Sequence, residues 1–277
     1  MSVFDALVSQ VISQNNEYPT LRTVIEKEIL HYDILRCMNE NGFLKNLTFM
    51  GGTCLRDCYG SVRMSEDLDF TGGFNFSKSD MSQLAFVIER AINKKYSLPV
   101  TVTEPAKETG NTETWKIKII TRPERLDFPA QKINIDICMV PSHDRKVLIL
   151  KNPYGIDMGI DGVLLYAESL AEILCDKLIA FARRPNRVKN RDLWDIHWLN
   201  QRNTSVNKQL LIQKLDDRKI DKNDFLKLYK SRVEEIKECQ KDFLFEMRRF
   251  LMPSVFTPQF ESEMWWEYLI CLLQSMI

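Results

Sequence analysis

Apolar and polar positions alternate with helical spacing over the first part of the chain. Residues 2–15 and 20–41 each fit an amphipathic helix, and Asn41-Gly42 predicts the end of the second one. In that second stretch the apolar positions are Leu21, Val24, Ile25, Ile29, Leu35 and Met38. The pattern therefore predicts two helices ahead of the first strand.

Glycine pairs and short apolar runs organise the next segment. A run at residues 47–50 predicts a strand, and Gly51-Gly52 turns it into a helix from about residue 53 to residue 59. Residues 68–71 predict a second strand, and residues 78–95 predict a helix. The order strand, helix, strand, helix is typical of a mixed α/β lobe.

Three further runs alternate with the period of half-buried strands, at residues 100–103, 114–120 and 132–138. In the last run the polar residues share one face; they are Lys132, Asn134, Asp136 and Cys138. From Ala167 onward the chain has helical spacing almost throughout. We therefore expect an α/β (α+β) lobe with a mixed sheet over residues 1–165, and a helical lobe over residues 166–277.

Composition narrows the class of protein. The 277 residues are 44% hydrophobic and 27% charged with a net charge of zero, so any affinity for nucleic acid must come from local patches. No run of about 18 apolar residues or secretory signal is visible, so we expect no membrane contact. The 7 cysteines are scattered without a CxxC pair, which favours reduced thiols in a cytoplasmic protein.

Two carboxylates, separated by one residue, stand at the start of the strand predicted at residues 68–71, the first of them directly before it. Asp67 and Asp69 point to the same side of that strand, where they repel each other unless a cation lies between them. Carboxylate oxygens of this kind bind magnesium or manganese, with triphosphate oxygens as further ligands. Asp136 is the candidate third ligand of a two-metal site, because Ile135 and Ile137 face the other way. The alternative is a solvated strand end without a metal.

The glycine turn ahead of these carboxylates suits a phosphate. Gly51 and Gly52 let the backbone approach closely at the start of a helix, and the hydroxyl of Thr53 can reach the β- or γ-phosphate. A plain strand-to-helix turn is the alternative. Arg56 and Arg63 either contact the same phosphates or pair with Asp57 or Glu66, and the sequence favours neither.

The order of these motifs resembles a known group of enzymes. Gly-Gly-Thr, then Asp-x-Asp, then a later strand aspartate is the pattern of the DNA polymerase β-like nucleotidyltransferase superfamily. The string GGTCLRDCYGSVRMSEDLDF more closely resembles the AbiEii/AbiGii-type nucleotidyltransferase toxins of bacterial toxin–antitoxin and abortive infection systems. A second segment agrees, with Lys177 on one helix and Arg191-Asp192-Leu193-Trp194-Asp195 on the next. The resemblance covers about residues 45–75 and 165–200.

The resemblance implies an enzyme that transfers a nucleotide from a nucleoside triphosphate, for some relatives onto the 3′ end of tRNA, and a cognate antitoxin as partner. Gly52 and Thr53 match the phosphate motif, and Asp67 and Asp69 match the metal pair. Ser65 adds to the nucleotide-binding set, at a place where some relatives carry a serine that the antitoxin modifies. Lys177 matches the lysine of the family, and either Asp192 or Asp195 matches its later aspartate, with Asp192 slightly favoured. The family's third carboxylate is variable, so Asp136 is its weakest match.

The residues of the second segment are compatible with this implication. Lys177 lies among apolar residues of its helix, where a lysine is ordinarily a solvated side chain; the motif order favours triphosphate binding. Residues 183–191 carry five cations, which indicates either a solvated loop or an RNA or triphosphate patch. Arg191 and Asp192 could also form a structural ion pair. His197 is expected to pack rather than to act as a base.

The sequence thus predicts a magnesium-dependent nucleotidyltransferase toxin acting on an RNA, with tRNA as the expected acceptor. Two other functions remain open. One is nucleotidyl transfer to a protein side chain, as in AMPylation, and the other is a catalytically silent module that binds a partner through its helical lobe. The intact Gly-Gly-Thr and Asp-x-Asp motifs favour the enzyme.

Overall fold

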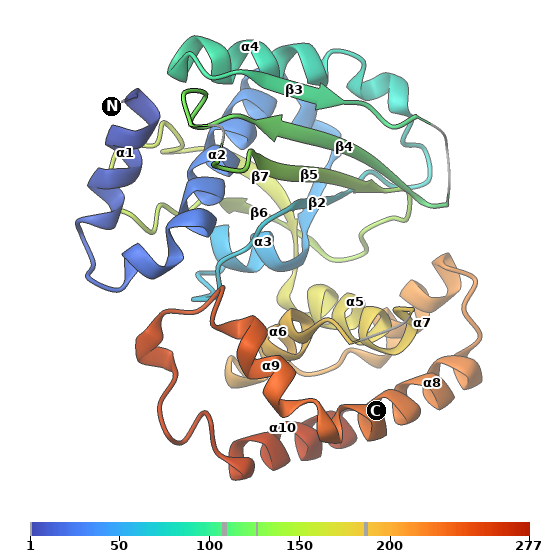
Figure 1. Cartoon of the computed structure of the whole chain (residues 1–277). Coiled ribbons are helices and arrows are strands. Elements are labelled where there is room, and N and C mark those ends of the chain that lie inside the picture. The colour runs from blue at the N-terminus through green and yellow to red at the C-terminus, as the bar shows by residue number, and fades with distance from the viewer. Residues whose placement is uncertain (1, 107–109, 126, 186–187) are drawn as a thin grey trace. The chain divides into compact units, whose positions relative to one another are not determined.

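One sheet with seven strands, in the order β3-β4-β5-β2-β1-β7-β6, forms the centre of the first part of the chain (Figure 1). The strand β2 pairs in parallel with β5 and antiparallel with β1, and β1 pairs in parallel with β7. The strands are β1 Thr48–Met50, β2 Leu68–Thr71, β3 Val100–Thr103, β4 Thr112–Ile119, β5 Gln131–Cys138, β6 Arg145–Ile149 and β7 Leu164–Glu168. The sheet is mixed, so the expected α/β fold class is confirmed.

The computed structural model describes residues 2–106, 110–125, 127–185 and 188–277. The chain divides into two units, Met1–Glu168 and Ser169–Ile277. The sheet lies wholly in the first unit, whereas all the described elements of the second unit are helical. Within the described ranges, every helix is too short or too polar to pass through a lipid bilayer.

Helices α2 and α4 pack against each other and cover one face of the sheet (Figure 1). The inward side chains Trp115, Ile117, Ile133 and Ile135 are buried beneath them, while the alternate positions of β4 and β5 are open. The helices of the first unit are α1 Val3–Ile12, α2 Arg22–Glu40, α3 Gly51–Asp57 and α4 Leu84–Tyr96, with 3-10 turns at Tyr18–Leu21, Phe43–Asn46 and Lys78–Met81. One face of the sheet therefore forms the core, and the other keeps the polar residues.

Helix α2 buries ionisable side chains as well as apolar ones. Glu26, Glu28, His31 and Asp33 are each no more than 2% exposed, and burial on this scale requires partners. Asp33 accepts hydrogen bonds from Lys95 and Tyr96 near the end of α4, both at 2.6 Å. Each of these α2 side chains contacts a different neighbouring element, so α2 holds the first unit together through polar contacts.

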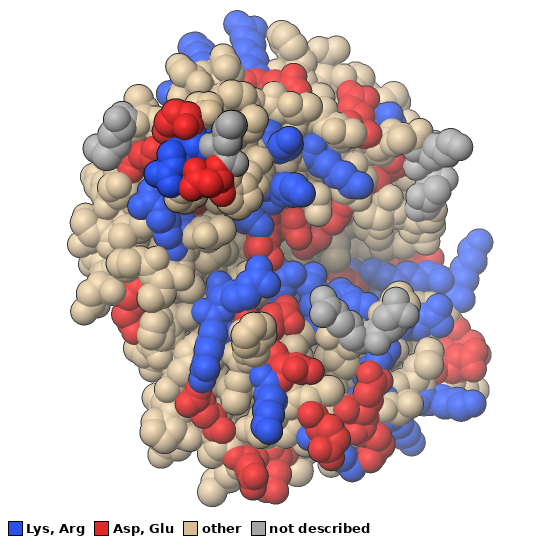
Figure 2. Space-filling view, viewed as in Figure 1, with Lys and Arg blue, Asp and Glu red and all other residues tan. Residues whose placement is uncertain are grey.

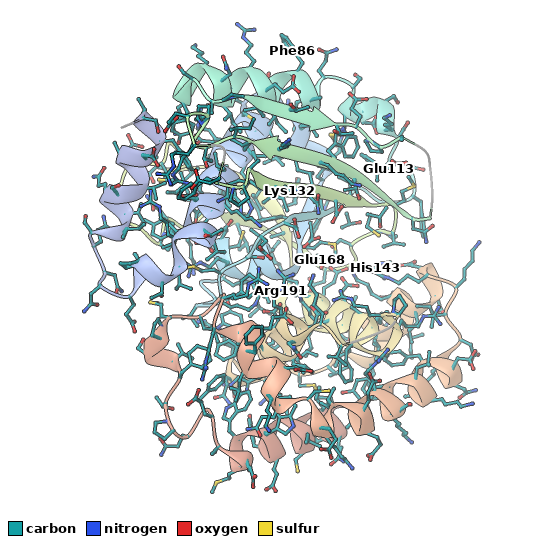
Figure 3. The ribbon with its side chains drawn as sticks, viewed as in Figure 1. Phe86, Glu113, Lys132, His143, Glu168 and Arg191 are labelled. Carbon is teal, nitrogen blue, oxygen red and sulfur yellow. The ribbon has the colours of Figure 1, made fainter. Side chains whose placement is uncertain are left out.

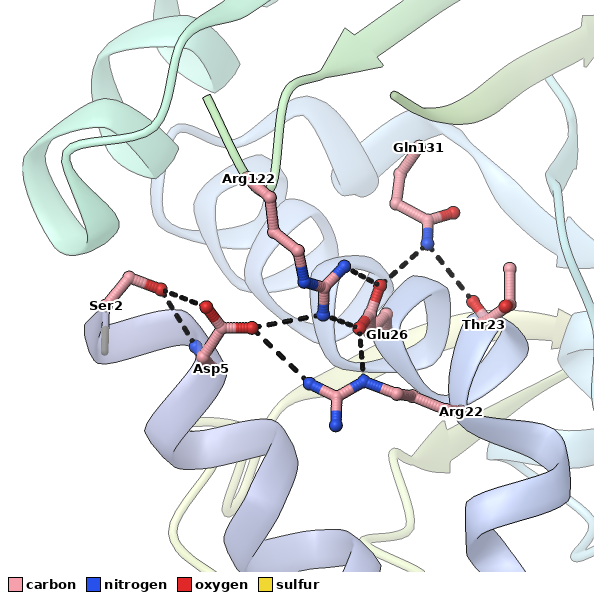
Figure 4. Close-up of polar contacts among 7 residues, drawn as sticks. All are labelled: Ser2, Asp5, Arg22, Thr23, Glu26, Arg122 and Gln131. Carbon is pink, nitrogen blue, oxygen red and sulfur yellow. Dashed lines mark hydrogen bonds and ion pairs between the residues drawn. The ribbon is translucent and has the colours of Figure 1, made fainter. Parts of the chain in front are cut away.

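The contacts of Glu26 show how the N-terminal helix is attached (Figure 4). Arg122, which follows β4, contacts the Glu26 carboxylate and also Asp5 of α1, with Nη2 3.0 Å from the Asp5 Oδ1. Arg22 contacts both carboxylates, and Gln131 donates to Glu26 at 2.9 Å. Two carboxylates and two guanidinium groups thus fasten α1 to α2 and to the strands.

The second unit is a set of helices around aromatic side chains. Phe243, Phe260, Trp265 and Trp266 pack ring against ring, with centroid distances from 4.6 to 6.4 Å. The helices are α5 Leu170–Arg183, α6 Asn190–Gln201, α7 Lys208–Asp217, α8 Lys222–Glu235, α9 Gln240–Met247 and α10 Glu263–Met276, with 3-10 turns at Ile236–Glu238 and Pro253–Val255. Ring pairs of this kind add to the burial energy of a small core.

The structure differs from the sequence prediction in three places. The helix expected over residues 78–95 is split into a 3-10 turn at Lys78–Met81, capped by Ser77, and α4. The strands β6 and β7 were not expected, because their outward residues Val147, Ile149 and Leu164 are apolar and hide the alternation. Helix α3 starts at Gly51 rather than near residue 53, because both glycines already belong to its first turn.

Candidate active site

The Gly-Gly-Thr motif forms the junction between β1 and α3. Gly51 has φ +74°, in the left-handed region where a side chain is strained, and a Cβ at this residue would lie 2.6 Å from Oδ2 of Asp69. A Cβ at Gly52 would overlap the guanidinium of Arg63 and contact the Ser65 hydroxyl. Both glycines are therefore required by close contact with other predicted site residues.

Thr53 is linked to the first carboxylate residue of the Asp-x-Asp motif. Its hydroxyl is fully buried and donates a hydrogen bond to the main-chain carbonyl of Asp67. This proton is therefore directed to the Asp67 carbonyl, and phosphate binding by Thr53 stays a prediction. Thr53 fixes where β2 begins relative to α3.

The three aspartates lie on one side of the sheet. Asp69 of β2 and Asp136 of β5 are register partners on neighbouring parallel strands, so their side chains project side by side. Asp67 Oδ1 accepts the main-chain amide of Asn134 at 3.1 Å, and Asp136 Oδ1 accepts the hydroxyl of Thr114 at 2.6 Å. These hydrogen bonds orient two of the three carboxylates.

Carboxylate oxygens from two adjacent strands are the ligand type that magnesium and manganese prefer. All three aspartates are only partly exposed, which suits a group enclosed between protein and substrate. Within the described ranges, no three or more His, Cys, Asp or Glu side chains are already gathered as a complete metal site. The residues fit a hard divalent cation by their donor chemistry, with substrate oxygens needed to complete its coordination.

Helix α2 holds the segment that leads into β2. The Nζ of Lys27 lies 2.6 Å from Oε1 of Glu66, and His31 Nε2 lies 3.0 Å from the Glu66 carbonyl. Burial lowers the pKa of His31, so the ring is neutral and donates this hydrogen bond from Nε2. Ser65 is buried beside Glu66 and faces Gly52. These two positioning contacts of Glu66 were not predicted from the sequence.

The two predicted arginines have different surroundings. Arg56 Nε lies 3.0 Å from Glu28 Oε1 of α2, and its Nη1 donates to the Ser61 carbonyl. Arg56 therefore forms its ion pair with Glu28. One of the two sequence interpretations had paired it with Asp57 or Glu66 instead. Arg63 is 2% exposed, donates to the Met64 carbonyl at 2.8 Å and lies against Gly52. Arg56 fastens α3, whereas Arg63 adjoins the glycine turn.

The second unit contains a separate cluster around Lys177 of α5. Its Nζ lies 2.7 Å from Asp192 Oδ1 and 2.7 Å from Asp195 Oδ2, both on α6. Arg184 Nη1 lies 3.0 Å from the other oxygen of Asp192. Burial raises the pKa of Asp192, but Lys177 and Arg184 outweigh it and leave that pKa below its ordinary value. The structure therefore brings together the lysine and both aspartates between which the sequence could not choose.

The cationic segment 183–191 does not act as one uniform patch. Arg191 Nε lies 3.5 Å from Glu246 of α9, and its guanidinium stacks over Phe250. Figure 3 labels Arg191 in the second unit. Burial lowers the pKa of Lys189. Residues 186–187 lie outside the described residues. At least two of its cations, Arg184 and Arg191, are engaged within the protein.

His197 is a packing residue, as expected. Its ring contacts Trp194, Trp265 and Tyr268, with centroid distances of 5.2 to 5.8 Å. Burial lowers its pKa from 6.5 to about 4. The ring is consequently neutral at physiological pH and part of the aromatic core.

Comparison with known proteins adds a family to this geometry. The sequence profile of the nucleotidyl transferase AbiEii toxin, type IV TA system, matches residues 33–263. No curated protein sequence matches significantly. Among solved structures, MenT4, a nucleotidyltransferase toxin from Mycobacterium tuberculosis, aligns with a TM-score of 0.50 at 18% identity over 74% of this chain. The alignment covers 66% of the MenT4 chain, so the chain spans just under two thirds of that relative.

A second solved structure, a Helicobacter pylori protein whose nucleotidyltransferase activity is inferred, aligns with a TM-score of 0.51 at 18% identity. The alignment covers 91% of this chain and 92% of the Helicobacter pylori chain. At this identity the two structures support the fold alone, whereas the sequence profile spans most of the chain and identifies the family.

Proposed function

The chain belongs to the AbiEii family of nucleotidyl transferase toxins, and on that premise we propose that it transfers a nucleoside monophosphate from a nucleoside triphosphate to the 3′ end of an RNA, with tRNA as the expected acceptor. The observation that carries the proposal is the register of Asp69 with Asp136 beside the glycine turn. In this reaction the acceptor hydroxyl forms a bond to the α-phosphorus, and pyrophosphate leaves.

The chain's residues bind and orient the reactants. Gly51 and Gly52 let Asp69 and Arg63 pack against the turn between β1 and α3, because neither glycine carries a side chain where those groups lie. The triphosphate is expected to bind at this glycine turn, at the start of α3. Asp67, Asp69 and Asp136 supply the oxygen ligands for a divalent ion. When bound, magnesium or manganese neutralises the triphosphate and polarises the reacting phosphate. Thr53 and Asn134 keep Asp67 in place through its carbonyl and its carboxylate.

The assignment of Lys177 to the triphosphate remains a prediction from the motif order of the family. Its amine is already neutralised by Asp192 and Asp195 within the second unit, which keeps the charged group in a fixed position. The family also implies an antitoxin partner, and modification of Ser65 by that partner is a further prediction from the resemblance. Ser65 is 6% exposed, so a modifying partner would need to open its surroundings first.

The decisive experiment incubates the protein with magnesium, total bacterial RNA and each α-labelled nucleoside triphosphate in turn. Label in a tRNA-sized band, lost in Asp67→Asn and in Asp69→Asn, would support the proposal. Asparagine keeps an oxygen that can accept the Asn134 amide, so the fold of Asp67→Asn should persist. Asp161→Asn, at an exposed aspartate of the same unit, is the matched control and should retain activity.

Other outcomes separate the rival functions. Label that is removed by protease rather than by RNase would assign the acceptor to protein and overturn the RNA proposal. Full transfer activity in Asp67→Asn would overturn the site. Absence of metal-dependent triphosphate binding would favour a silent partner-binding module.

A further inference from the structure

The open face of the sheet carries three lysines in a row that leads to the carboxylates. Lys118 of β4 and Lys132 of β5 are direct register partners, Lys116 pairs with Asn134, and Thr114 pairs with Asp136. The three lysines, Lys116, Lys118 and Lys132, are exposed, and we call them the lysine face. Figure 3 labels Lys132 on β5, and Figure 2 shows basic side chains gathered over β4 and β5.

The lysine face is electrostatically unfavourable by itself. Like charges directly opposite each other on neighbouring strands destabilise a sheet, and Lys118 and Lys132 form no ion pair with another described residue. The outward positions of β3, β4 and β5 contain one carboxylate, Asp136. Lysines often protect the edge of a sheet, but β4 and β5 are interior strands, so that explanation does not apply.

The lysine face has a defined distance from the site. From Lys132 to Asp136 is four residues along β5, or about 13 Å at the rise of a strand. About four stacked nucleotides cover that length, at about 3.4 Å each. A group bound directly to the aspartates would not extend over the whole face, whereas a strand whose end reacts there would.

We propose, on the basis of the proposed function, that the lysine face binds the backbone phosphates of the acceptor RNA and directs its 3′ end toward Asp136 and Asp69. The side chains of Thr101 and Thr103 on β3 lie opposite Lys118 and Lys116 and offer further hydroxyl donors. No aromatic side chain occupies an outward position of these three strands, so the bases have no stacking partner there. Recognition on this face is therefore independent of base sequence.

The test measures binding of a short single-stranded RNA by fluorescence anisotropy over a range of salt concentrations, without triphosphate. The double variant Lys118→Gln with Lys132→Gln should bind about tenfold more weakly at moderate salt, and the slope of log affinity against log salt should decrease by about 1.4, at about 0.7 per phosphate contact. Lys118→Arg with Lys132→Arg keeps both charges and should bind as the wild type does.

The matched control is Arg90→Gln with Lys94→Gln. These two exposed cations are neighbours on α4, away from the lysine face, and their loss changes the net charge by the same amount. An equal loss of binding in the control and in the lysine variant would overturn the proposal, because net charge alone would then explain it. An unchanged salt slope in the lysine variant would overturn it as well.

A transfer assay distinguishes failure of the proposed function from failure of the lysine face. The same proteins are assayed for labelled transfer to RNA, and absence of RNA label from the wild type would refute the proposed reaction. The salt slope needs no catalysis, so it tests the lysine face whatever the transfer assay gives. Wild-type transfer to RNA together with unaltered binding by the lysine variant would refute the lysine face alone.

Discussion

The hydroxyl of Thr53 donates a hydrogen bond to the main-chain carbonyl of Asp67. A threonine that the sequence assigns to phosphate binding is thereby tied to the start of the carboxylate strand. The two motifs, Gly-Gly-Thr and Asp-x-Asp, are parts of one hydrogen-bonded unit rather than two independent ligand sites.

Thr53→Val should therefore impair the metal-binding strand more than triphosphate affinity. Loss of the hydrogen bond donated by the buried Thr53 leaves the Asp67 carbonyl without this partner, a cost of about 1–3 kcal/mol. We expect a fall of about tenfold in kcat and a higher magnesium requirement, with little change in the KM for triphosphate. Thr53→Ser keeps the donor and should retain most of the activity. A selective rise in KM would instead show that the hydroxyl contacts phosphate.

Gly51→Ala should inactivate the enzyme through the Asp69 carboxylate. The added Cβ would lie 2.6 Å from Oδ2 of Asp69, in addition to the strain of a positive φ. Gly73→Ala is the control, because Gly73 has φ +75° and a Cβ there would meet nothing within 4 Å. Both variants should lose about 1 kcal/mol of stability from backbone strain, measured by urea unfolding, but Gly51→Ala alone should lose transfer activity. Equal activity in the two would contradict the close-contact argument.

Lys177→Met should destabilise the second unit. It leaves the buried carboxylates of Asp192 and Asp195 without their shared cation, which costs about 3–5 kcal/mol. The triple variant with Asp192→Asn and Asp195→Asn removes the uncompensated charge and should recover most of that loss. Chemical unfolding of the three proteins measures both effects. No recovery in the triple variant would mean that Lys177 contributes by packing rather than by charge.

The stability of the second unit should fall as the pH is lowered, through His197. The pKa of His197 is about 4 in the folded chain and 6.5 for a histidine in its ordinary, solvated surroundings. As the pH falls, the unfolded chain therefore takes up this proton at a higher pH than the folded chain does. The lost stability appears as pH falls below 6.5 and is complete below 4. Between pH 7.5 and pH 5 this group alone should remove about 2 kcal/mol. His197→Phe should remove this contribution from the pH dependence of the unfolding free energy, measured by urea unfolding at each pH. An unaltered pH dependence would refute the assignment.

Much of the fold follows from local patterns. β2 and β3 occur at the predicted residues, and β5 keeps the predicted polar face with Asp136 on it. Alternation decides these strands because one face is buried and the other is open. β6 and β7 were not predicted, because Val147 and Leu164 are apolar although they are exposed. Apolar and polar residues therefore do not alternate along these two strands.

The candidate site was only partly predictable. Residue types and spacing made Asp67 and Asp69 candidates, because their chemistry is local to a motif, whereas the resemblance to the family added Lys177. The partners that orient them come from distant segments: His31 is 35 residues from Glu66, and Asn134 is 67 residues from Asp67. Pairing of Arg56 with Glu28 likewise depends on how α2 crosses the sheet, which no spacing along the chain records.

The strand that carries Asp69 is the fourth of seven and is hydrogen-bonded on both sides. Its main-chain amides can exchange with solvent only when the sheet itself comes apart, because no edge gives access to them. Heat inactivation and loss of structure in this unit should accordingly coincide in one transition. The arrangement of the carboxylates should therefore be lost at the same temperature as the sheet, and not before it.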